Sequence, residues 1–569
     1  MTSIFRCLLI ASVMLSALTF AQVTGTAAAK PANRAVIEGL VTKEPGSEPV
    51  KKAVIELIAE NQTEGGDYTA VSAADGSFHI EGILPGRYRL FAERTGLLEV
   101  DKHRTRADGR VLTLAAGQEL KDLRIWLQAA AVVRGRVTDE DGDAMPNAQV
   151  TVLRQTFVSG HGRWEQAGAE RTNDLGEYRV PGLGAGNYYV SVSPAPDFKS
   201  LIEAAGVGTA EPRAADKAAT HTSYQTTYYP GTADRSQAAP IQLRAGDDFP
   251  IDFSLTPTPS LSIRGVVVNL PPRASAAIML QSRDFSLVLN GAEMHPDGSF
   301  VIRDVAPGSY TILATVEGAA VPMMARQALQ VVSSSVEDLR LAPQPGGSVR
   351  GRLRVTSGGS LVKFDPNQFF LALHPVDGDD EMLNMSMAGA GANSVIHVAG
   401  DGSFEWKGVP AGTYYMELTG DPGTSADWYL KSVFAGGREA DDSGFSVNGG
   451  NVALDLMASA NGAVVEGAVA DRKGEPMANA VIVAVPEARL RTRVDRWRKT
   501  VSDQSGRFSL RGVRPGEYTL FAWETVDGES YYNPEFLKAF EAQGSALHVA
   551  EGDRKSVNLE EIPEPEEQP

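Results

Sequence analysis

One stretch of the sequence recurs five times, and this repetition constrains the fold more than any other feature. Each copy has a glycine followed two residues later by an aromatic residue, then a second glycine followed two residues later by tyrosine. The two glycines are ten residues apart in every copy: Gly76/Gly86, Gly176/Gly186, Gly298/Gly308, Gly402/Gly412 and Gly506/Gly516. Self-similarity at a constant spacing indicates tandem domains of one kind.

The first copy predicts two consecutive short strands. Asp75 and Gly76 form a tight-turn signal, because glycine accepts positive φ without steric cost. Phe78 then starts an apolar–polar alternation, the period of a half-buried strand. Pro-Gly at Gly86 predicts a second turn with glycine in the left-handed position, after which Tyr88 resumes the alternation. We expect the aromatic after each first glycine to be a core residue: Phe78, Tyr178, Phe300, Phe404 and Phe508.

Other shared elements complete each repeat. An opening strand carries a glycine at Gly39, Gly135, Gly265, Gly351 or Gly467, and an alternating strand closes each unit. About seven short strands over roughly 85 to 130 residues are typical of a Greek-key sandwich. The sequence therefore predicts an all-β protein, a tandem array of five Greek-key β-sandwich domains.

The predicted domains are residues 34–128, 130–256, 260–343, 346–458 and 460–561, with insertions in the second and fourth. We refer to them as repeats 1 to 5. The links between them are short, so we expect a semi-rigid, elongated array. Residues 562–569 are acidic and rich in proline, which is typical of a disordered tail.

The N-terminus is typical of an export signal. Arg6 precedes an apolar run, Cys7 to Leu18, that is too short to span a membrane. The signal ends at residue 21, and a second small-x-small site would extend it to residue 29. Cys7 is the only cysteine, so the mature chain would have no disulfide or thiolate site. We expect an exported protein, periplasmic, outer-surface or extracellular, with no transmembrane segment in the mature chain.

The residues that usually carry catalysis are scattered. The net charge of −18 disfavours nucleic acid as a partner. The eight histidines form neither His-x-x-Glu nor His-Glu-x-x-His, and no nucleophile elbow or Walker loop is present. The acidic stretches 139–143 and 377–381 lack the terminal glutamate of an EF-hand and are interpreted as turns, with weak calcium binding left open. We expect no enzyme active site, no cofactor and no metal.

A basic run and three aromatic pairs remain as candidate binding features. Basic residues flank Trp497 between two predicted strands of repeat 5, and we interpret this run as an exposed hairpin and not as a polyanion site. Adjacent aromatics cannot both enter one core from a regular strand, because side chains alternate. One member of each pair could therefore stack on a sugar or a partner, unless the loop packs on its own sandwich. The candidate ligand-binding residues are Tyr228, Tyr229, Trp428, Tyr429, Tyr531 and Tyr532, at corresponding places in repeats 2, 4 and 5.

The repeat resembles the carboxypeptidase regulatory-like domain. The resemblance rests on the opening Gly-x-Val, the Pro-x-x-x-Ala-x-Val second strand and the Gly-x-Phe…Pro-Gly-x-Tyr core. It covers nearly the whole mature chain and is strongest in repeats 1, 2 and 5. It implies a transthyretin-like sandwich with a carbohydrate-binding-like fold, and it points to a bacterial envelope protein, but it supplies no reaction.

Two classes of function follow. The first is a non-catalytic exported binding or structural protein whose sandwich loops bind a polysaccharide or an envelope protein. The alternatives are a purely structural spacer, or an accessory subunit of an exported hydrolase or transporter. Exposed aromatic pairs would favour binding over a spacer.

Overall fold

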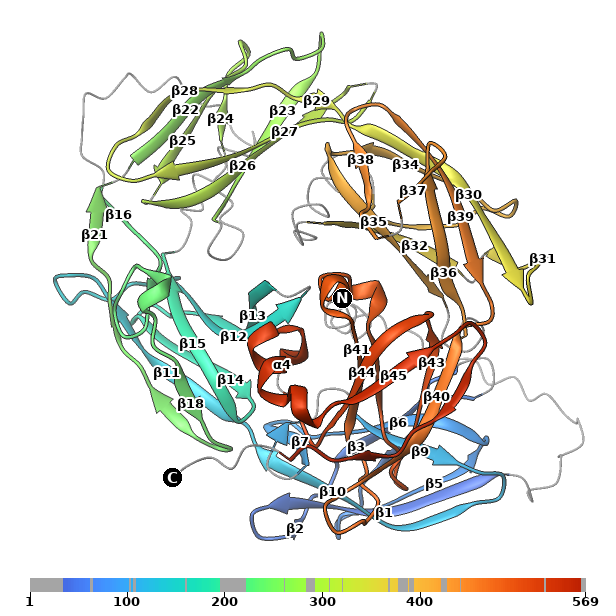
Figure 1. Cartoon of the computed structure of the whole chain (residues 1–569). Coiled ribbons are helices and arrows are strands. Elements are labelled where there is room, and N and C mark those ends of the chain that lie inside the picture. The colour runs from blue at the N-terminus through green and yellow to red at the C-terminus, as the bar shows by residue number, and fades with distance from the viewer. Residues whose placement is uncertain are drawn as a thin grey trace, which may run out of the picture.

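The computed structural model describes residues 34–61, 65–101, 104–105, 109–158, 161–194, 222–259, 261–282, 292–305, 307–319, 321–366, 369–376, 387, 393–420, 427–440, 442–526 and 529–563. Ten sheets pair into five β-sandwiches, which confirms the predicted all-β fold (Figure 1). A separate two-stranded ribbon of β16 (Thr222–Tyr224) and β21 (Pro257–Pro259) lies between repeats 2 and 3. The predicted signal segment, residues 1–21 or 1–29, lies outside the described residues.

The first sheet of each sandwich holds the opening and closing strands. In repeat 1 it comprises β1 (Ala35–Glu44), β2 (Glu48–Pro49), β5 (Ser77–Ile83), β7 (Leu97–Asp101), β8 (Arg104–Thr105) and β10 (Glu119–Ala129). In repeat 2 it comprises β11 (Ala131–Thr138), β14 (Glu177–Leu183), β19 (Asp248–Pro250) and β20 (Phe253–Ser254). In repeat 3 it comprises β22 (Leu261–Val267), β24 (Glu293–Met294), β25 (Ser299–Val305) and β28 (Val336–Leu341). In repeat 4 it comprises β30 (Gly347–Ser357), β31 (Ser360–Val362), β34 (Ser403–Val409), β36 (Tyr429–Ala435), β37 (Arg438–Glu439) and β39 (Asn451–Ser459). In repeat 5 it comprises β40 (Ala463–Ala470), β43 (Arg507–Val513), β46 (Arg554–Ser556) and β47 (Leu559–Glu560).

The second sheet holds the strand that begins at the second glycine. In repeat 1 it comprises β3 (Val54–Ala59), β4 (Tyr68–Val71), β6 (Gly86–Glu93) and β9 (Arg110–Leu114). In repeat 2 it comprises β12 (Gln149–Val158), β13 (His161–Arg171), β15 (Gly186–Ser193), β17 (Thr227–Tyr228) and β18 (Ile241–Leu243). In repeat 3 it comprises β23 (Ser275–Ser282), β26 (Gly308–Glu317), β27 (Met323–Val331) and β29 (Gln344–Pro345). In repeat 4 it comprises β32 (Phe369–Pro375), β33 (Val395–His397), β35 (Gly412–Gly420) and β38 (Phe445–Val447). In repeat 5 it comprises β41 (Val481–Pro486), β42 (Arg498–Val501), β44 (Gly516–Trp523) and β45 (Ser545–Val549).

A glycine–aromatic pair sits at the centre of every first sheet. The opening strand runs antiparallel to the strand after the first glycine and parallel to the closing strand. This register places each opening-strand glycine directly opposite the core aromatic: Gly39/Phe78, Gly135/Tyr178, Gly265/Phe300, Gly351/Phe404 and Gly467/Phe508. All five aromatics are buried, as predicted.

The opening-strand glycine leaves the space that the ring occupies. A Cβ atom at Gly39 would lie 2.6 Å from the Phe78 ring and would overlap the carbonyl oxygen of Leu123 on the closing strand. The same carbonyl clash would arise in the other four repeats. Repeat 2 has tyrosine at the aromatic position, and its hydroxyl donates to the carbonyl of Ile251 on the closing segment at 2.7 Å. The pair therefore sets how closely three strands approach.

The first motif glycine behaves as predicted. Gly76, Gly176, Gly298, Gly402 and Gly506 all have φ between +73° and +84°. The carbonyl of each accepts a 2.8 Å hydrogen bond from the opening strand. These shared turns hold the two strands of the first sheet in register.

The predicted left-handed turn at Gly86 is wrong. Gly86 begins β6, and the left-handed residue is Gly82, four residues earlier, with φ of +75°. The ring of Tyr88 folds back beside Gly86 instead, and its hydroxyl donates to the carbonyl of Leu84 at 2.7 Å. Tyr188, Tyr414 and Tyr518 make the same bond four residues upstream, which is a tyrosine corner.

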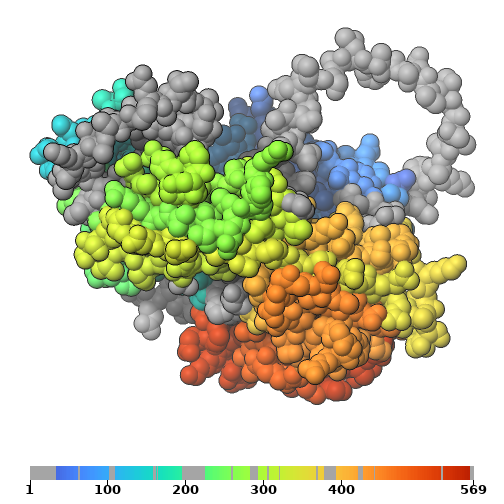
Figure 2. All heavy atoms as spheres, turned by 90° about the horizontal axis from the view of Figure 1, so that it is seen from above, coloured from blue at the N-terminus to red at the C-terminus, as the bar shows by residue number. Residues whose placement is uncertain are grey.

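The chain closes on itself, so the expectation of an elongated array is also wrong. Figure 1 shows the five sandwiches around a centre, with repeat 5 (orange to red) beside repeat 1 (blue). The side-chain amide of Gln504 in repeat 5 bonds both backbone groups of Thr113 in repeat 1. The space-filling view shows repeat 4 (yellow to orange) adjoining repeat 5 (red) (Figure 2).

The C-terminal part of repeat 5 contains a helix that the sequence patterns did not predict. Helix α4 (Pro534–Phe540) starts at Asn533, whose side chain accepts from the backbone N–H of Glu535, and lies near the centre in Figure 1. Ile562, the first residue of the predicted disordered tail, is instead buried beside Trp523. Residues 564–569 lie outside the described part of the chain.

The glycine–aromatic pair gives a stability prediction. Gly467→Ala should lower the free energy of unfolding by about 2–3 kcal/mol, because the added methyl group would overlap the Val557 carbonyl between paired strands. Thermal unfolding of the mature chain measures the loss. Gly450→Ala is the matched control, because nothing lies within 4 Å of a Cβ there. Equal stability of the two variants would show that the close approach is not required.

Candidate ligand-binding surfaces

The three aromatic pairs occupy different places in their sandwiches, contrary to the expected correspondence. Tyr228 ends β17, which pairs with β15 in the second sheet of repeat 2. Tyr429 begins β36, which pairs with β39 in the first sheet of repeat 4. Tyr531 lies in the short 3-10 helix η7 (Ser530–Tyr532) of repeat 5, beside β12 of repeat 2.

One member of each pair is buried, and the other is half-buried. Tyr228, Tyr429 and Tyr531 are 3–4% exposed. Their partners Tyr229, Trp428 and Tyr532 retain some surface, so they are the members that a ligand could reach.

The half-buried members also contact their own repeats. Trp428 packs on Phe369 with ring centroids 4.4 Å apart, and Tyr532 packs edge-on against Trp497 at 4.6 Å. Burial, followed by the charge of Glu529, raises the pKa of Tyr532. These contacts give the pairs a structural role, whatever they bind.

The central residues of the basic run of repeat 5 are buried and contact repeat 4, so the interpretation of the run as an exposed hairpin is wrong for these residues, whereas the Arg489 side chain is 61% exposed. Arg493 and Arg496 are 5% and 6% exposed, and Trp497 is 5% exposed. The guanidinium group of Arg493 makes a two-pronged pair with Asp495 at 2.8 and 3.0 Å. It also lies 4.2 Å from the ring centre of Tyr415 in repeat 4.

Asp442 of repeat 4 accepts hydrogen bonds from two arginines of this run. Arg489 and Arg496 each donate to its carboxylate at 2.7 Å. Burial opposes ionisation of Asp442, but the hydrogen bond from Arg489 and the charge of Arg496 outweigh it and hold its pKa below the usual 3.8. A second carboxylate of repeat 4, Asp427, forms a two-pronged pair with Arg511 of repeat 5 at 2.6 and 2.7 Å. The basic run therefore joins two repeats.

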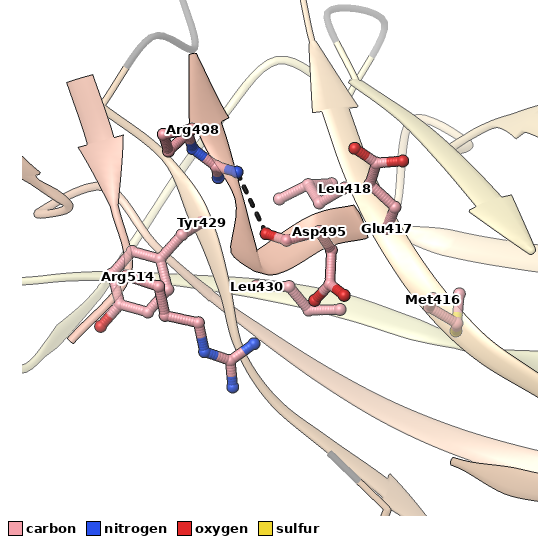
Figure 3. A pocket seen from close by; sticks show the side chains of 8 residues that line it. All are labelled: Met416, Glu417, Leu418, Tyr429, Leu430, Asp495, Arg498 and Arg514. Atoms are coloured by element: carbon pink, nitrogen blue, oxygen red, sulfur yellow. Dashed lines mark hydrogen bonds between the residues drawn. The ribbon is translucent and has the colours of Figure 1, made fainter. Parts of the chain in front are cut away.

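A small cavity of about 20 Å³ lies within this interface (Figure 3). Glu417 and Tyr429 of repeat 4 face Asp495, Arg498 and Arg514 of repeat 5 across it. Arg498 donates to the carbonyl of Asp495 at 3.0 Å. The volume accommodates about one water molecule, so the cavity is too small for a sugar or a peptide.

A larger groove of about 1090 Å³ separates repeats 3 and 4. Repeat 3 contributes β27, the end of β28 and the segment after it, and repeat 4 contributes the end of β32, the start of β35 and the residues that follow β38. Polar groups along it include Arg326, Gln327, Arg340, Gln344, Thr413 and Asn448, among apolar residues such as Pro345, Val376 and Pro410. Sequence reasoning missed this surface, because it is formed by two repeats and neither carries a motif for it.

Several histidines and acidic turns in the described part of the chain make local contacts. His374 lies 3.0 Å from Glu417, and His548 lies 2.6 Å from Glu517. The carboxylate of Asp139 accepts from the backbone N–H groups of residues 141 and 143, and Asp471 of repeat 5 makes the equivalent turn. No group of three potential metal ligands occurs in the described part of the chain, and the stretch 377–381 lies outside it.

Comparison with known proteins identifies the repeat. The sequence profile of the carboxypeptidase regulatory-like domain matches residues 36–127, 132–256 and 464–535, just over half of the chain. No curated protein matches the sequence. Within the described residues, no helix has the length and apolar character needed to span a membrane.

Several solved structures match parts of this chain at low similarity. The TIE protein of Bacillus anthracis is 12% identical with a TM-score of 0.16, over 55% of this chain and 51% of that protein, so the chain spans about half of its length. The minor pilin GBS52 of Streptococcus agalactiae is 12% identical with a TM-score of 0.21, and the match covers 40% of this chain and 97% of that protein. BcpA, the major pilin subunit of Bacillus cereus, is 10% identical with a TM-score of 0.14, and the match covers 74% of this chain and 99% of that protein. These scores support no functional argument.

The interface of repeats 4 and 5 gives a prediction on acid stability. Because the folded pKa of Asp442 is lowered, its contribution is present above its ordinary pKa of 3.8 and is lost as the pH falls through the folded value. Asp442→Asn should cost about 1 kcal/mol at pH 7, since the carboxylate is partly exposed, and should weaken the acid dependence of unfolding.

Differential scanning calorimetry at pH 7 and pH 3 measures both effects. Asp455→Asn is the control, because Asp455 forms only an exposed pair with Arg354 in the same repeat. If both variants resembled the parent protein at pH 7, the Asp442 pairs would not stabilise the interface.

Proposed function

Since the chain belongs to the carboxypeptidase regulatory-like domain family, we propose that it is a non-catalytic, exported binding protein whose ligand is a polysaccharide. Export rests on the signal-like N-terminus, and the envelope or cell exterior is the corresponding site of action. The observation that carries the proposal is the groove between repeats 3 and 4.

The chemistry of the groove fits a sugar chain. Amide, hydroxyl and guanidinium groups of Gln327, Gln344, Thr413 and Arg340 supply donors and acceptors for sugar hydroxyls. Apolar residues between them suit the apolar faces of sugar rings, and ligand sites in general combine apolar walls with a few polar groups. A volume of about 1090 Å³ is large enough for several sugar units.

The half-buried aromatics supply further contacts in this proposal. Tyr229, Trp428 and Tyr532 lie on repeats 2, 4 and 5, so several weak stacking contacts could act along one polymer. Each stacking contact contributes roughly 1 kcal/mol beyond burial of area. An envelope protein remains the alternative partner.

The purely structural spacer is the less favoured function. A spacer acts through its length, whereas the contacts of Gln504 with Thr113 bring the first and last repeats together. An accessory role beside an exported hydrolase or transporter is compatible with polysaccharide binding, because recognition would be the contribution of this chain.

Polysaccharide retention in affinity electrophoresis tests the groove. Gln327→Ala combined with Gln344→Ala should reduce retention of the mature protein about tenfold, because two hydrogen-bonding groups are lost. Gln330→Ala, on the same strand but not among the residues lining the groove, should leave retention unchanged. Retention of the double variant equal to that of the parent, or no retention of the parent by any tested polysaccharide, would contradict the proposal.

The aromatic contribution is tested separately. Trp428→Ala should weaken retention by about fivefold, the loss of one stacking contact. Trp428→Phe keeps an aromatic face toward Phe369 and should preserve most of the retention. If the two substitutions changed thermal stability alone and left retention intact, Trp428 would be a packing residue only.

A further inference from the structure

Strand β9 of repeat 1 is an edge strand. The order of the second sheet is β4-β3-β6-β9, and β9 pairs with β6 on one side only. An edge strand carries a row of N–H and C=O groups that can pair with another chain. In β9, the N–H groups of Val111 and Thr113 point away from β6 and are satisfied by repeat 5.

Repeat 5 caps this edge with side-chain amides. Gln504 accepts from the backbone N–H of Thr113 at 2.9 Å and donates to its carbonyl at 2.7 Å, the two bonds that a neighbouring strand would make. Asn479 accepts from the N–H of Val111 at 3.4 Å. Arg87 of the adjacent strand β6 donates to the carbonyl of Val501 in repeat 5.

Burial agrees with this contact. Leu112 and Leu114 enter the core of repeat 1, so the Val111 side chain points to the opposite face of the sheet. It is nevertheless only 1% exposed. The capping residues lie in turns of repeat 5: Asn479 has a φ of +63°, and Gln504 follows Asp503 in the turn that ends at Gly506. Turn residues of repeat 5, and not a strand, therefore join the last repeat to the first.

The contact is heterologous, because β9 and the capping turns are different surfaces of the molecule. Such a contact can close within one chain or join two chains. Repeat 5 is joined to repeat 4 by arginine–aspartate pairs, in which the side chain of Arg496 is buried and the Asp442 carboxylate is partly exposed, whereas the groove lies at the junction of repeats 3 and 4. A movement at that junction that also separates η7 of repeat 5 from β12 of repeat 2 would carry repeats 4 and 5 away from β9 as one unit.

We propose that β9 is a docking edge for repeat 5 of a second copy of this chain. In the closed molecule its own repeat 5 occupies the edge, because intramolecular contacts form at a high effective concentration. When the edge and the capping turns belong to two molecules that cannot close by themselves, the same hydrogen bonds join them.

A complementation experiment with two full-length mature variants tests this. The first variant, Asn479→Gly with Gln504→Ala, keeps β9 but lacks the capping amides; glycine retains the positive φ at residue 479. The second variant, Thr113→Pro with Arg87→Ala, keeps the capping turns but lacks the edge groups; proline is tolerated on edge strands. In each variant alone the contact is weakened. The first loses both amide caps, and the second loses the N–H group of residue 113 and the guanidinium group of residue 87, while the N–H group of Val111 remains.

The expected result is complementation. By analytical ultracentrifugation at roughly 0.5 mM, each variant alone and the parent protein should sediment as monomers, while a mixture of the two should contain a 1:1 complex. The effective concentrations of short links, which are in the millimolar range, set this working concentration. Replacing the second variant with the parent should reduce the complex about tenfold, because the parent occupies its own edge.

A matched control excludes general effects of turn substitutions. Asn147→Gly with Asp174→Ala changes the equivalent turns of repeat 2, where Asn147 has a φ of +60°. This control should behave like the parent. Failure of the two variants to form a complex while both retain the circular dichroism of the parent would overturn the proposal, as would self-association of the first variant through paired β9 edges. If Thr113→Pro unfolds repeat 1, Arg87→Ala alone replaces the second variant and should give a weaker complex.

Discussion

The contact between a glycine of the opening strand and an aromatic ring of the next strand underlies each sandwich. The absence of a side chain at Gly467 allows the Phe508 ring and the Val557 carbonyl to meet above the same backbone position. This contact joins the opening strand to both of its neighbours, one antiparallel and one parallel. The hydrophobic core then forms between this sheet and the strand that carries the corner tyrosine. Because all five repeats share the pairing, one geometric constraint accounts for the common fold.

The repeats differ in what surrounds this shared centre, and these differences set the arrangement of the domains. Repeat 5 has a basic segment between β41 and β42 that pairs with Asp442 of repeat 4, so the two repeats form a unit. Its turns at Asn479 and Gln504 meet the edge strand of repeat 1. Charged and amide side chains therefore join neighbouring repeats to one another, while apolar residues stabilise each sandwich. Acid should thus act on the junction between repeats 4 and 5 before it acts on the cores.

Sequence patterns predicted the features that lie within one repeat. The turn at Gly506 and the burial of Phe508 followed from local turn chemistry and alternation, and the structure confirms both. The predicted left-handed turn at Gly86 was wrong, because the Pro-Gly pair instead leaves room for the Tyr88 ring, which folds back beside Gly86. Binding by the aromatic pairs stays a prediction.

Features formed by several repeats could not be read in the same way. The basic run looked exposed because its partners Asp442 and Tyr415 belong to another domain. The groove and the contact between the first and last repeats depend on how whole repeats lie against one another, and this leaves no pattern in a single repeat. A cluster of arginines in a chain of net charge −18 was the one available signal of an interface.

The five sandwiches form a closed arrangement, and small-angle X-ray scattering of the chain from residue 22 onward measures it most directly. A closed arrangement predicts a radius of gyration below about 35 Å, since a compact chain of this length would have about 24 Å. A radius above about 45 Å, as expected for five domains in line, each with a radius of gyration near 13 Å, would contradict it.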